Sequence, residues 1–342
     1  MTAIPSTTPV KPHQDGISRP TFSVIVPTRD RPVLFRAALE SVLGQADVAL
    51  EVIVINDGST PAFHSQYADI ERTFAGTTER PVRYVHLEHL PKGHGQSYAL
   101  NTGAGNASGR YLCFLDDDDV WTDMGHLARA QVLVDAAAEP DLLLFDQAAF
   151  REDGLVTQPI WLEDLGIRLR ANGSPAGHGY NVTPEQLLTA TGFCHVNTTV
   201  IGAGLFHRIG GLNESLFYEC DRDFYLRAID AAKGILYCPE VVARHNIPDP
   251  VLGASMSTRA RPLEKRLCQF ILLNHAAFTS RHPAIRDHAR RHRRYAVLKA
   301  LKACRSLRDY GRIGSAVARS IGREMTGRWG GPTDPIEPQT PG

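Results

Sequence analysis

Short apolar segments alternate with segments of helical periodicity through the first half of the chain, and this alternation is what most constrains its fold. Residues 22–26, 51–55 and 110–115 are apolar and rich in β-branched or aromatic side chains, which predicts buried strands. Residues 32–43 and 95–106 have helical spacing instead. Strands that alternate with helices predict an α/β fold built on a largely parallel sheet.

The rest of the chain divides into regions of different character. Further elements are predicted as strands at 82–86, 141–145, 198–201 and 235–237, and as helices at 121–138 and 221–232. The stretch 151–191 is broken by Gly and Pro and reads as a loop-rich insertion that could shape an acceptor pocket. The predicted organisation is a disordered tail (1–20), a catalytic α/β domain (21–250), a basic helical region (251–330) and a second disordered tail (331–342).

Charge is unevenly distributed along the chain. Lys and Arg together number 37, as do Asp and Glu, yet residues 256–330 hold 18 basic and four acidic residues. Such a region needs an anionic partner or a solvent-facing role, so docking on an anionic membrane and a solvated helical subdomain both remain open. Binding of nucleic acid is disfavoured, because few aromatic residues lie among the basic ones.

Cysteine spacing and hydropathy restrict the cellular setting. The six cysteines include no CxxC pair, which argues against a structural zinc site and a disulfide framework. No run approaches the roughly 20 apolar residues needed to span a bilayer, and the N-terminal residues lack the apolar core of a signal peptide. We therefore expect a cytoplasmic protein, with peripheral association at the inner face of the cell membrane as the alternative raised by the basic region.

Four consecutive aspartates, 116–119, directly follow the predicted strand 110–115. Adjacent carboxylates repel one another, and their oxygens are the ligands that Mg²⁺ or Mn²⁺ prefers when it bridges a protein to substrate phosphates. In isolation the run also fits a solvated acidic turn, or a helix start at which Asp119 and Asp123 would favour the helix dipole. Residues 56–60 and 27–31 follow two other predicted strands and, taken alone, are ordinary turn sequences.

Considered together, these motifs carry a family resemblance. VIVPTRDR, VIVINDGST and GRYLCFLDDDDVW, in this order and spacing, resemble family 2 glycosyltransferases of the GT-A fold. FHRIGGLNESL followed by CDRDFYLR is similar to the acceptor-side segment of that family. The resemblance spans residues 22–245. It implies a Rossmann-like nucleotide-sugar-binding sheet flanked by helices, followed here by the basic C-terminal helical region.

The resemblance also implies an activity and its participants. The reaction would be inverting transfer of a sugar from a nucleotide diphosphate donor, UDP by analogy, to a saccharide or lipid-linked acceptor in polysaccharide or glycoconjugate biosynthesis. Asp221 matches the catalytic base that takes a proton from the acceptor hydroxyl. The competing interpretation is that Asp221 merely caps its helix.

The remaining site residues follow from the same matching of motifs. Pro27, Thr28 and Arg29 would line the base site, Asp57 would accept a hydrogen bond from uracil, and Lys92 would approach the diphosphate. Residues 116–118 would form the DxD motif.

Metal binding would then fall to two of these aspartates and to a later histidine. Asp118 would be the direct ligand of Mn²⁺ or Mg²⁺, while Asp116 or Asp117 would assist it or meet the ribose. His245 would add a metal-binding nitrogen, although a lone histidine is more often structural. His195 and Asn197 could face the acceptor, but nothing in their spacing requires it.

Two departures from the family pattern bear on this assignment. Cys220 stands where relatives commonly have Glu, and Leu100 stands where they commonly have Arg, which removes an expected positive contact near the donor. A non-catalytic nucleotide-sugar or glycan-binding protein with the same fold is the first alternative. A metal-dependent phosphohydrolase or nucleotidyltransferase built around the aspartate run is the second.

Overall fold

The computed structural model describes most of the chain between Pro20 and Thr326. The described ranges are 20–76, 79–135, 140–162, 164–173, 175–190, 192–247 and 260–326. Apart from Pro20, both predicted disordered tails lie outside the described residues, as do residues 251–259 of the predicted basic region.

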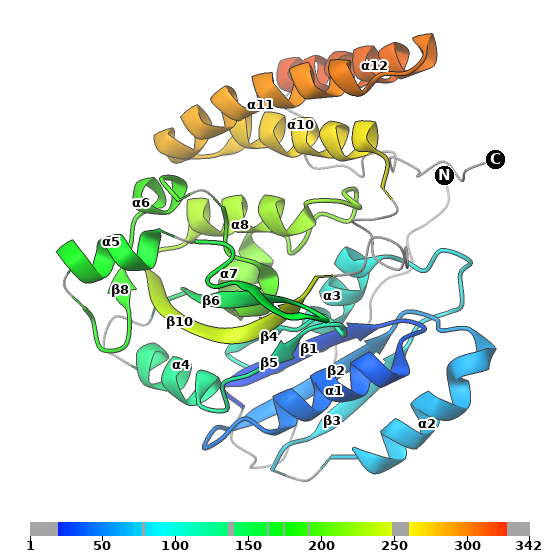
Figure 1. The fold of residues 1–342 in the computed structure, drawn as a ribbon, viewed down its shortest axis with the longest axis vertical. Coiled ribbons are helices and arrows are strands. Elements are labelled where there is room, and N and C mark those ends of the chain that lie inside the picture. Colours follow the sequence, from blue (N-terminus) through cyan, green and yellow to red (C-terminus); the bar gives the residue numbers. More distant parts are fainter. Residues whose placement is uncertain are drawn as a thin grey trace.

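A single sheet forms the centre of the fold (Figure 1). Its strands are β1 (Phe22–Thr28), β2 (Leu50–Asn56), β3 (Val82–His86), β4 (Tyr111–Phe114), β5 (Val120–Trp121), β6 (Leu142–Arg151), β7 (Gly154–Thr157), β8 (Tyr180–Asn181), β9 (Thr199–Gly202) and β10 (Ile235–Asn246). The order is β3-β2-β1-β4-β9-β6-β10-β5, with β7 paired to β6 and β8 to β10. Strands β3, β2, β1 and β4 are parallel, whereas β9 is antiparallel to both of its neighbours. The predicted α/β class and its parallel half are confirmed.

Alternation along β1 gives the sheet an apolar layer on each face. Val24 and Val26 pack with α1 (Pro32–Leu43) and α2 (His64–Thr73), whereas Ile25 packs with α3 (Gln96–Gly105). Successive strand side chains point to opposite faces, so a β-branched run can fill both cores. The residues that follow β1, β2 and β4 consequently meet at one edge of the sheet, where their carboxyl ends converge.

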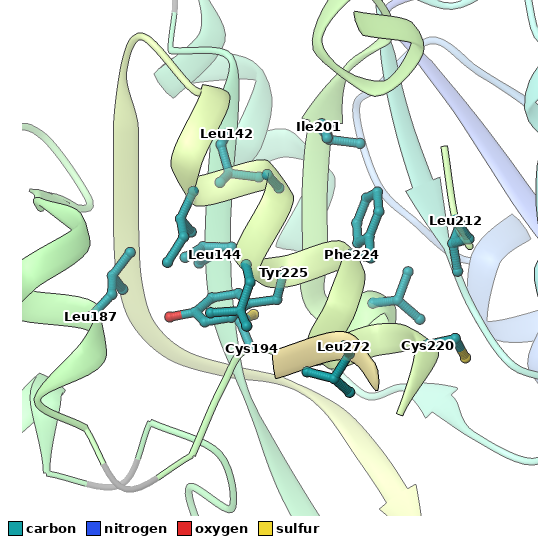
Figure 2. Close-up of a cluster of buried hydrophobic side chains, with 14 of the residues drawn as sticks. Leu142, Leu144, Leu187, Cys194, Ile201, Leu212, Cys220, Phe224, Tyr225 and Leu272 are labelled. Atoms are coloured by element: carbon teal, nitrogen blue, oxygen red, sulfur yellow. The ribbon is translucent and has the colours of Figure 1, made fainter. Parts of the chain in front are cut away.

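The second half of the sheet is covered by α8 (Cys220–Ala231), with α7 (Ala203–Arg208) beside it (Figure 1). Figure 2 shows Phe224 and Tyr225 of α8 among Leu142, Leu144 and Ile201 of the sheet. Burial of these side chains fixes which side of α8 packs on the sheet. The first turn of the helix then lies near the end of β4.

Three predictions for individual elements need correction. The helix expected at 121–138 is wrong at its start: Trp121 lies in β5, with its indole N–H donating to the Asn197 carbonyl, and helix α4 is His126–Val134. The strand expected at 235–237 extends to Asn246 through register shifts after Cys238, so His245 lies within β10 and not after it. The stretch 151–191 is not merely loop, because it contains α5 (Leu165–Asn172) and α6 (Pro184–Leu188).

The basic C-terminal region is helical, as predicted, and is divided into α10 (Pro262–Thr279), α11 (Pro283–Ala303) and α12 (Leu307–Thr326). Helix α10 packs on the α8 side of the molecule, and its Cys268 and Leu272 belong to the same core as Phe224. Figure 1 shows α11 and α12 beyond α10, away from the sheet. None of the described helices combines the length and apolar character required to cross a bilayer.

Candidate active site

The aspartate run occupies the turn between β4 and β5, and one arginine compensates two of its members. Arg31, from the loop after β1, places Nη2 2.5 Å from Asp117 Oδ1 and Nη1 2.6 Å from Asp118 Oδ2. Asp117 is buried and Asp118 is partly exposed. No sequence motif assigns Arg31 a role. The feature that points to it is its position two residues after Arg29, in a turn that follows a buried strand.

Asp119 has a different environment from its neighbours. This buried carboxylate accepts hydrogen bonds from Gln147 Nε2 (2.9 Å), Asn197 Nδ2 (2.7 Å) and the Asn246 amide (2.9 Å), and His245 Nδ1 lies 3.0 Å away. Burial opposes its ionisation, but these contacts, chiefly that with His245, lower the pKa of Asp119 below its ordinary value. No helix begins here, so the helix-start interpretation of Asp119 is wrong. Asp119 joins β6, β10 and the segment before β9.

Asp116 is held beside α3 and α8. Gln96 Nε2 donates to its Oδ1 at 2.6 Å. Burial, reinforced by the nearby carboxylates of Asp118 and Asp221 and opposed by His195, raises the pKa of Asp116 to about 7. The site therefore carries negative charge that the protein alone does not fully stabilise.

This charge and the donor chemistry fit a divalent cation. Carboxylate oxygens at Asp116 and Asp118 suit Mg²⁺ or Mn²⁺, and a cation beside Asp116 would remove the cost of ionising it. The bond from His245 to Asp119 would orient the ring, leaving Nε2 as the nitrogen that faces a ligand. Within the described ranges, however, no three His, Cys, Asp or Glu side chains are gathered closely enough to form a metal site. The three predicted ligands thus lie in one region without forming a ready ligand set.

The predicted base-site residues are brought together at the ends of β1 and β2. The Thr28 hydroxyl lies 2.8 Å from that of Tyr67, and Pro27 precedes it within β1. Arg29 donates from Nη1 to the Asp57 carbonyl and from Nη2 to the Leu90 carbonyl, each at 2.7 Å. Arg29 therefore ties the end of β2 to the loop between β3 and α3.

That loop also covers the side chain of Asp57. The Asp57 carboxylate accepts from the backbone amides of His94 (2.9 Å) and Gly95 (3.1 Å), and His94 Nδ1 lies 2.8 Å from Oδ1. Lys92 is exposed in the same loop. At Gly93 a Cβ would come within 2.5 Å of the Asp57 carboxylate, so the close approach requires glycine. Both Asp57 oxygens are thus already hydrogen-bonded within the chain.

Asp221 lies in the first turn of α8, across from the aspartate run. Its Oδ2 is 3.4 Å from His195 Nε2, and its Oδ1 is buried without a hydrogen-bond partner among the described residues. Glu219 occupies the N-cap, so the interpretation of Asp221 as the helix cap is wrong. Gln96 connects Asp116 to the first turn of α8, because it donates to Asp116 while its Oε1 lies 4.0 Å from the Sγ of Cys220.

Aromatic residues line the other side of Asp221. The Trp161 ring is nearly parallel to the His195 ring, at 12° and 5.4 Å between centroids, and also faces Phe193 and His245. Trp161 Nε1 donates to Gln147 Oε1 at 2.8 Å. No local sequence signal joins residues 161, 195 and 221, since the fold alone brings them together.

Leu100, the departure from the family pattern in α3, is fully buried in the core. Its neighbour Asn101 exchanges hydrogen bonds with the backbone of Leu212. The position therefore supports the packing of α3 and does not contact a donor.

Comparison with known proteins relates part of the chain to a family. The family model described as glycosyl transferase family 2 matches residues 23–178. The chain is 34% identical over 161 residues to the uncharacterized glycosyltransferase YibD of Escherichia coli K12, covering 46% of this chain and 41% of YibD. It spans between 14% and 41% of the length of the first three curated relatives it matches.

Solved structures show the same fold. S. aureus TarS 1–349 in complex with UDP-GlcNAc superposes with a TM-score of 0.64 at 17% identity, over 89% of this chain and 81% of that one. The mannosyltransferase PcManGT of Pyrobaculum calidifontis, in complex with GDP-Man and Mn²⁺, gives a TM-score of 0.55 at 18% identity, over 93% and 86%. Residues 23–178 therefore match the glycosyl transferase family 2 model, and the chain shares its fold with TarS, a glycosyltransferase of the GT-A type.

Proposed function

We propose that this chain is a metal-dependent, inverting glycosyltransferase. It moves a sugar from a nucleoside diphosphate, for which UDP is the first candidate, to a saccharide or lipid-linked acceptor. One observation carries the proposal: Asp116 lies close enough to both Asp118 and Asp221 for their charges to raise its pKa, and Asp221 Oδ1 has no hydrogen-bond partner among the described residues. Asp116 and Asp118 are suited to a donor diphosphate and its cation, and Asp221 to an acceptor hydroxyl.

The chain's own residues divide the chemistry between two sides of the site. Asp221 Oδ1 accepts the proton of the acceptor hydroxyl as that oxygen attacks the anomeric carbon, and the diphosphate leaves from the opposite face. This single displacement inverts the anomeric configuration. Arg29, Asp57 and Lys92 hold the nucleotide, while Asp116 and Asp118 would hold Mn²⁺ or Mg²⁺, with His245 as a third donor. Such a cation would neutralise negative charge on the diphosphate.

The relatives support the donor class without specifying it. TarS and PcManGT are described in complex with UDP-GlcNAc and with GDP-Man, respectively. Thermal stability of the full chain with UDP, GDP, CMP and dTDP sugars, each with and without Mn²⁺, identifies the donor, because a ligand of the native state raises Tm. We expect a Mn²⁺-dependent rise with one nucleotide class. It should be lost in Asp118→Ala and kept in Asp153→Ala, which removes an exposed carboxylate.

The selected donor then tests turnover and stereochemistry. Release of the nucleoside diphosphate with candidate acceptors, and NMR of the product anomer, should show transfer with inversion and its loss in Asp221→Asn. Binding without turnover would favour the non-catalytic alternative. Release of inorganic phosphate from a sugar phosphate would favour the phosphohydrolase.

We also propose that the outer face of α11 and α12 rests on an anionic membrane surface, where a lipid-linked acceptor would reside. Four large side chains of these two helices are exposed: Tyr295 (62%), Leu298 (55%), Leu307 (89%) and Tyr310 (51%). Arginines and lysines lie among them in the sequence. Apolar insertion and attraction to anionic headgroups, about 1 kcal/mol per basic residue near the surface, would act together.

Surface substitutions test this docking better than deletion, because α10 belongs to the main core. Leu298→Ser with Leu307→Ser should reduce sedimentation with phosphatidylglycerol vesicles. Leu155→Ser with Val156→Ser, which alters exposed apolar residues of β7, should leave it unchanged. Equal sedimentation of both variants and the wild type would contradict the proposal.

A further inference from the structure

We infer that His195 is a positioning residue for the catalytic base: its Nε2 lies 3.4 Å from Oδ2 of Asp221 and orients the carboxylate, which leaves Oδ1 without a partner in the described part of the chain. The inference rests on the proposed role of Asp221. It adds a residue that neither the sequence motifs nor the family match assigns.

The hydrogen bonds of the His195 ring fix where its proton lies. The Asn197 amide donates to Nδ1 at 3.3 Å, which makes Nδ1 an acceptor and places the ring proton on Nε2. Nε2 is the atom 3.4 Å from Asp221 Oδ2. Protonation of the ring would leave this Nε2–H in place, so the donor faces Asp221 in either state.

The plane of the His195 ring is fixed by a second set of contacts. Trp161 stacks on it almost in parallel, and the Trp161 indole is itself anchored by its bond to Gln147. The ring is largely buried, and its own backbone carbonyl accepts from Thr199 Oγ1 at 2.9 Å. A ring stacked on one face and held at one nitrogen presents its remaining nitrogen in one direction.

The two oxygens of Asp221 consequently differ. Oδ2 faces the histidine, whereas Oδ1 is buried with no hydrogen-bond partner in the described part of the chain. Glu219, the residue that caps α8, makes no side-chain cap bond that could orient Asp221 from the helix side. A carboxylate at a helix start has several rotamers, and a fixed partner on one oxygen selects among them. His195 thereby fixes the orientation of the Asp221 carboxylate and leaves Oδ1 as the oxygen available to accept a proton.

Two substitutions at this position separate positioning from packing. His195→Phe keeps an aromatic ring against Trp161 but removes the donor, and His195→Gln retains an N–H near the position of Nε2. Loss of a hydrogen bond to a charged group corresponds to about a 10- to 100-fold effect on rate. We expect His195→Phe to lower kcat by about that factor, with the donor KM changed less than about twofold, and His195→Gln to recover most of the loss.

The assay is hydrolysis of the donor selected by thermal stability, in which water replaces the acceptor, together with Tm for each variant. In the Asp221→Asn background, His195→Phe should cause no further loss, because both changes act through the same carboxylate. Wild-type kcat in His195→Phe, or an equal fall in the double variant beyond Asp221→Asn, would overturn the inference. Full activity of Asp221→Asn would instead overturn the proposed base, so the two failures are distinguishable.

Discussion

Asp118 and Asp119 are adjacent in sequence, yet their removal should change the stability of the fold by very different amounts. Asp119 is about 1% exposed and is contacted by four donors from three segments, whereas Asp118 is partly exposed and its side chain is paired with Arg31 alone among the described contacts. Removing one partner from a buried charged network costs about 3–5 kcal/mol. At about 2 °C per kcal/mol for a chain of this size, Asp119→Ala should lower Tm by about 6–10 °C.

Asp118→Ala should leave Tm within about 2 °C of the wild type, because Arg31 keeps its contact with Asp117 and one like charge is removed. Differential scanning calorimetry of both variants in metal-free buffer measures the contrast. An Asp119→Ala variant that melts with the wild type, or an Asp118→Ala variant that melts with Asp119→Ala, would refute this division between a structural and a functional carboxylate.

Three further perturbations test other parts of the structure. Hydrogen bonds from serine hydroxyls and a backbone amide outweigh burial and hold the pKa of Glu51 below its ordinary 4.5, so Glu51 stabilises the fold above about pH 4.5 and this stability is lost as pH falls through the lowered value. The Tm difference between wild type and Glu51→Gln should therefore narrow in melts taken from pH 7 to pH 3. Gly93→Ala should weaken nucleotide binding at least about tenfold by calorimetric titration, since its Cβ would meet Arg29 and Asp57 at 2.5 Å; unchanged affinity would contradict this. Phe224→Ala should cost about 3–5 kcal/mol in urea unfolding, because the ring is about 1% exposed in the core of Figure 2.

The sequence was sufficient to predict the parallel half of the sheet and the segments that meet at its edge. Residues 22–28 and 50–56 are rich in β-branched side chains and buried along their whole length, so a central strand is the structure that suits them best. Each run is followed by a polar turn. The antiparallel half was harder. Trp121 precedes a helical pattern and was assigned to that helix, but its indole is satisfied by the backbone of Asn197 far along the chain.

The roles within the site were predictable only in part. Four identical aspartates look equivalent in sequence, and their environments differ because Arg31 reaches two of them while Asn197 and His245 reach another. The sequence leaves open whether His195 faces the acceptor, since its partner Asp221 lies in another element. Such assignments depend on tertiary contacts between residues whose separation follows no period.

The covered carboxylate of Asp57 has a consequence for selectivity if this residue meets the nucleobase. A ligand must exchange the amide donors of His94 and Gly95 for its own, so its net gain at this carboxylate is a difference between two sets of hydrogen bonds. A base with a well-placed N–H recovers what the loop gives up, whereas a base without one leaves a buried anion unsatisfied. The free enzyme would thereby select between nucleobases at the expense of affinity. Binding and release of the nucleotide would depend on movement of the loop that carries His94 and Gly95.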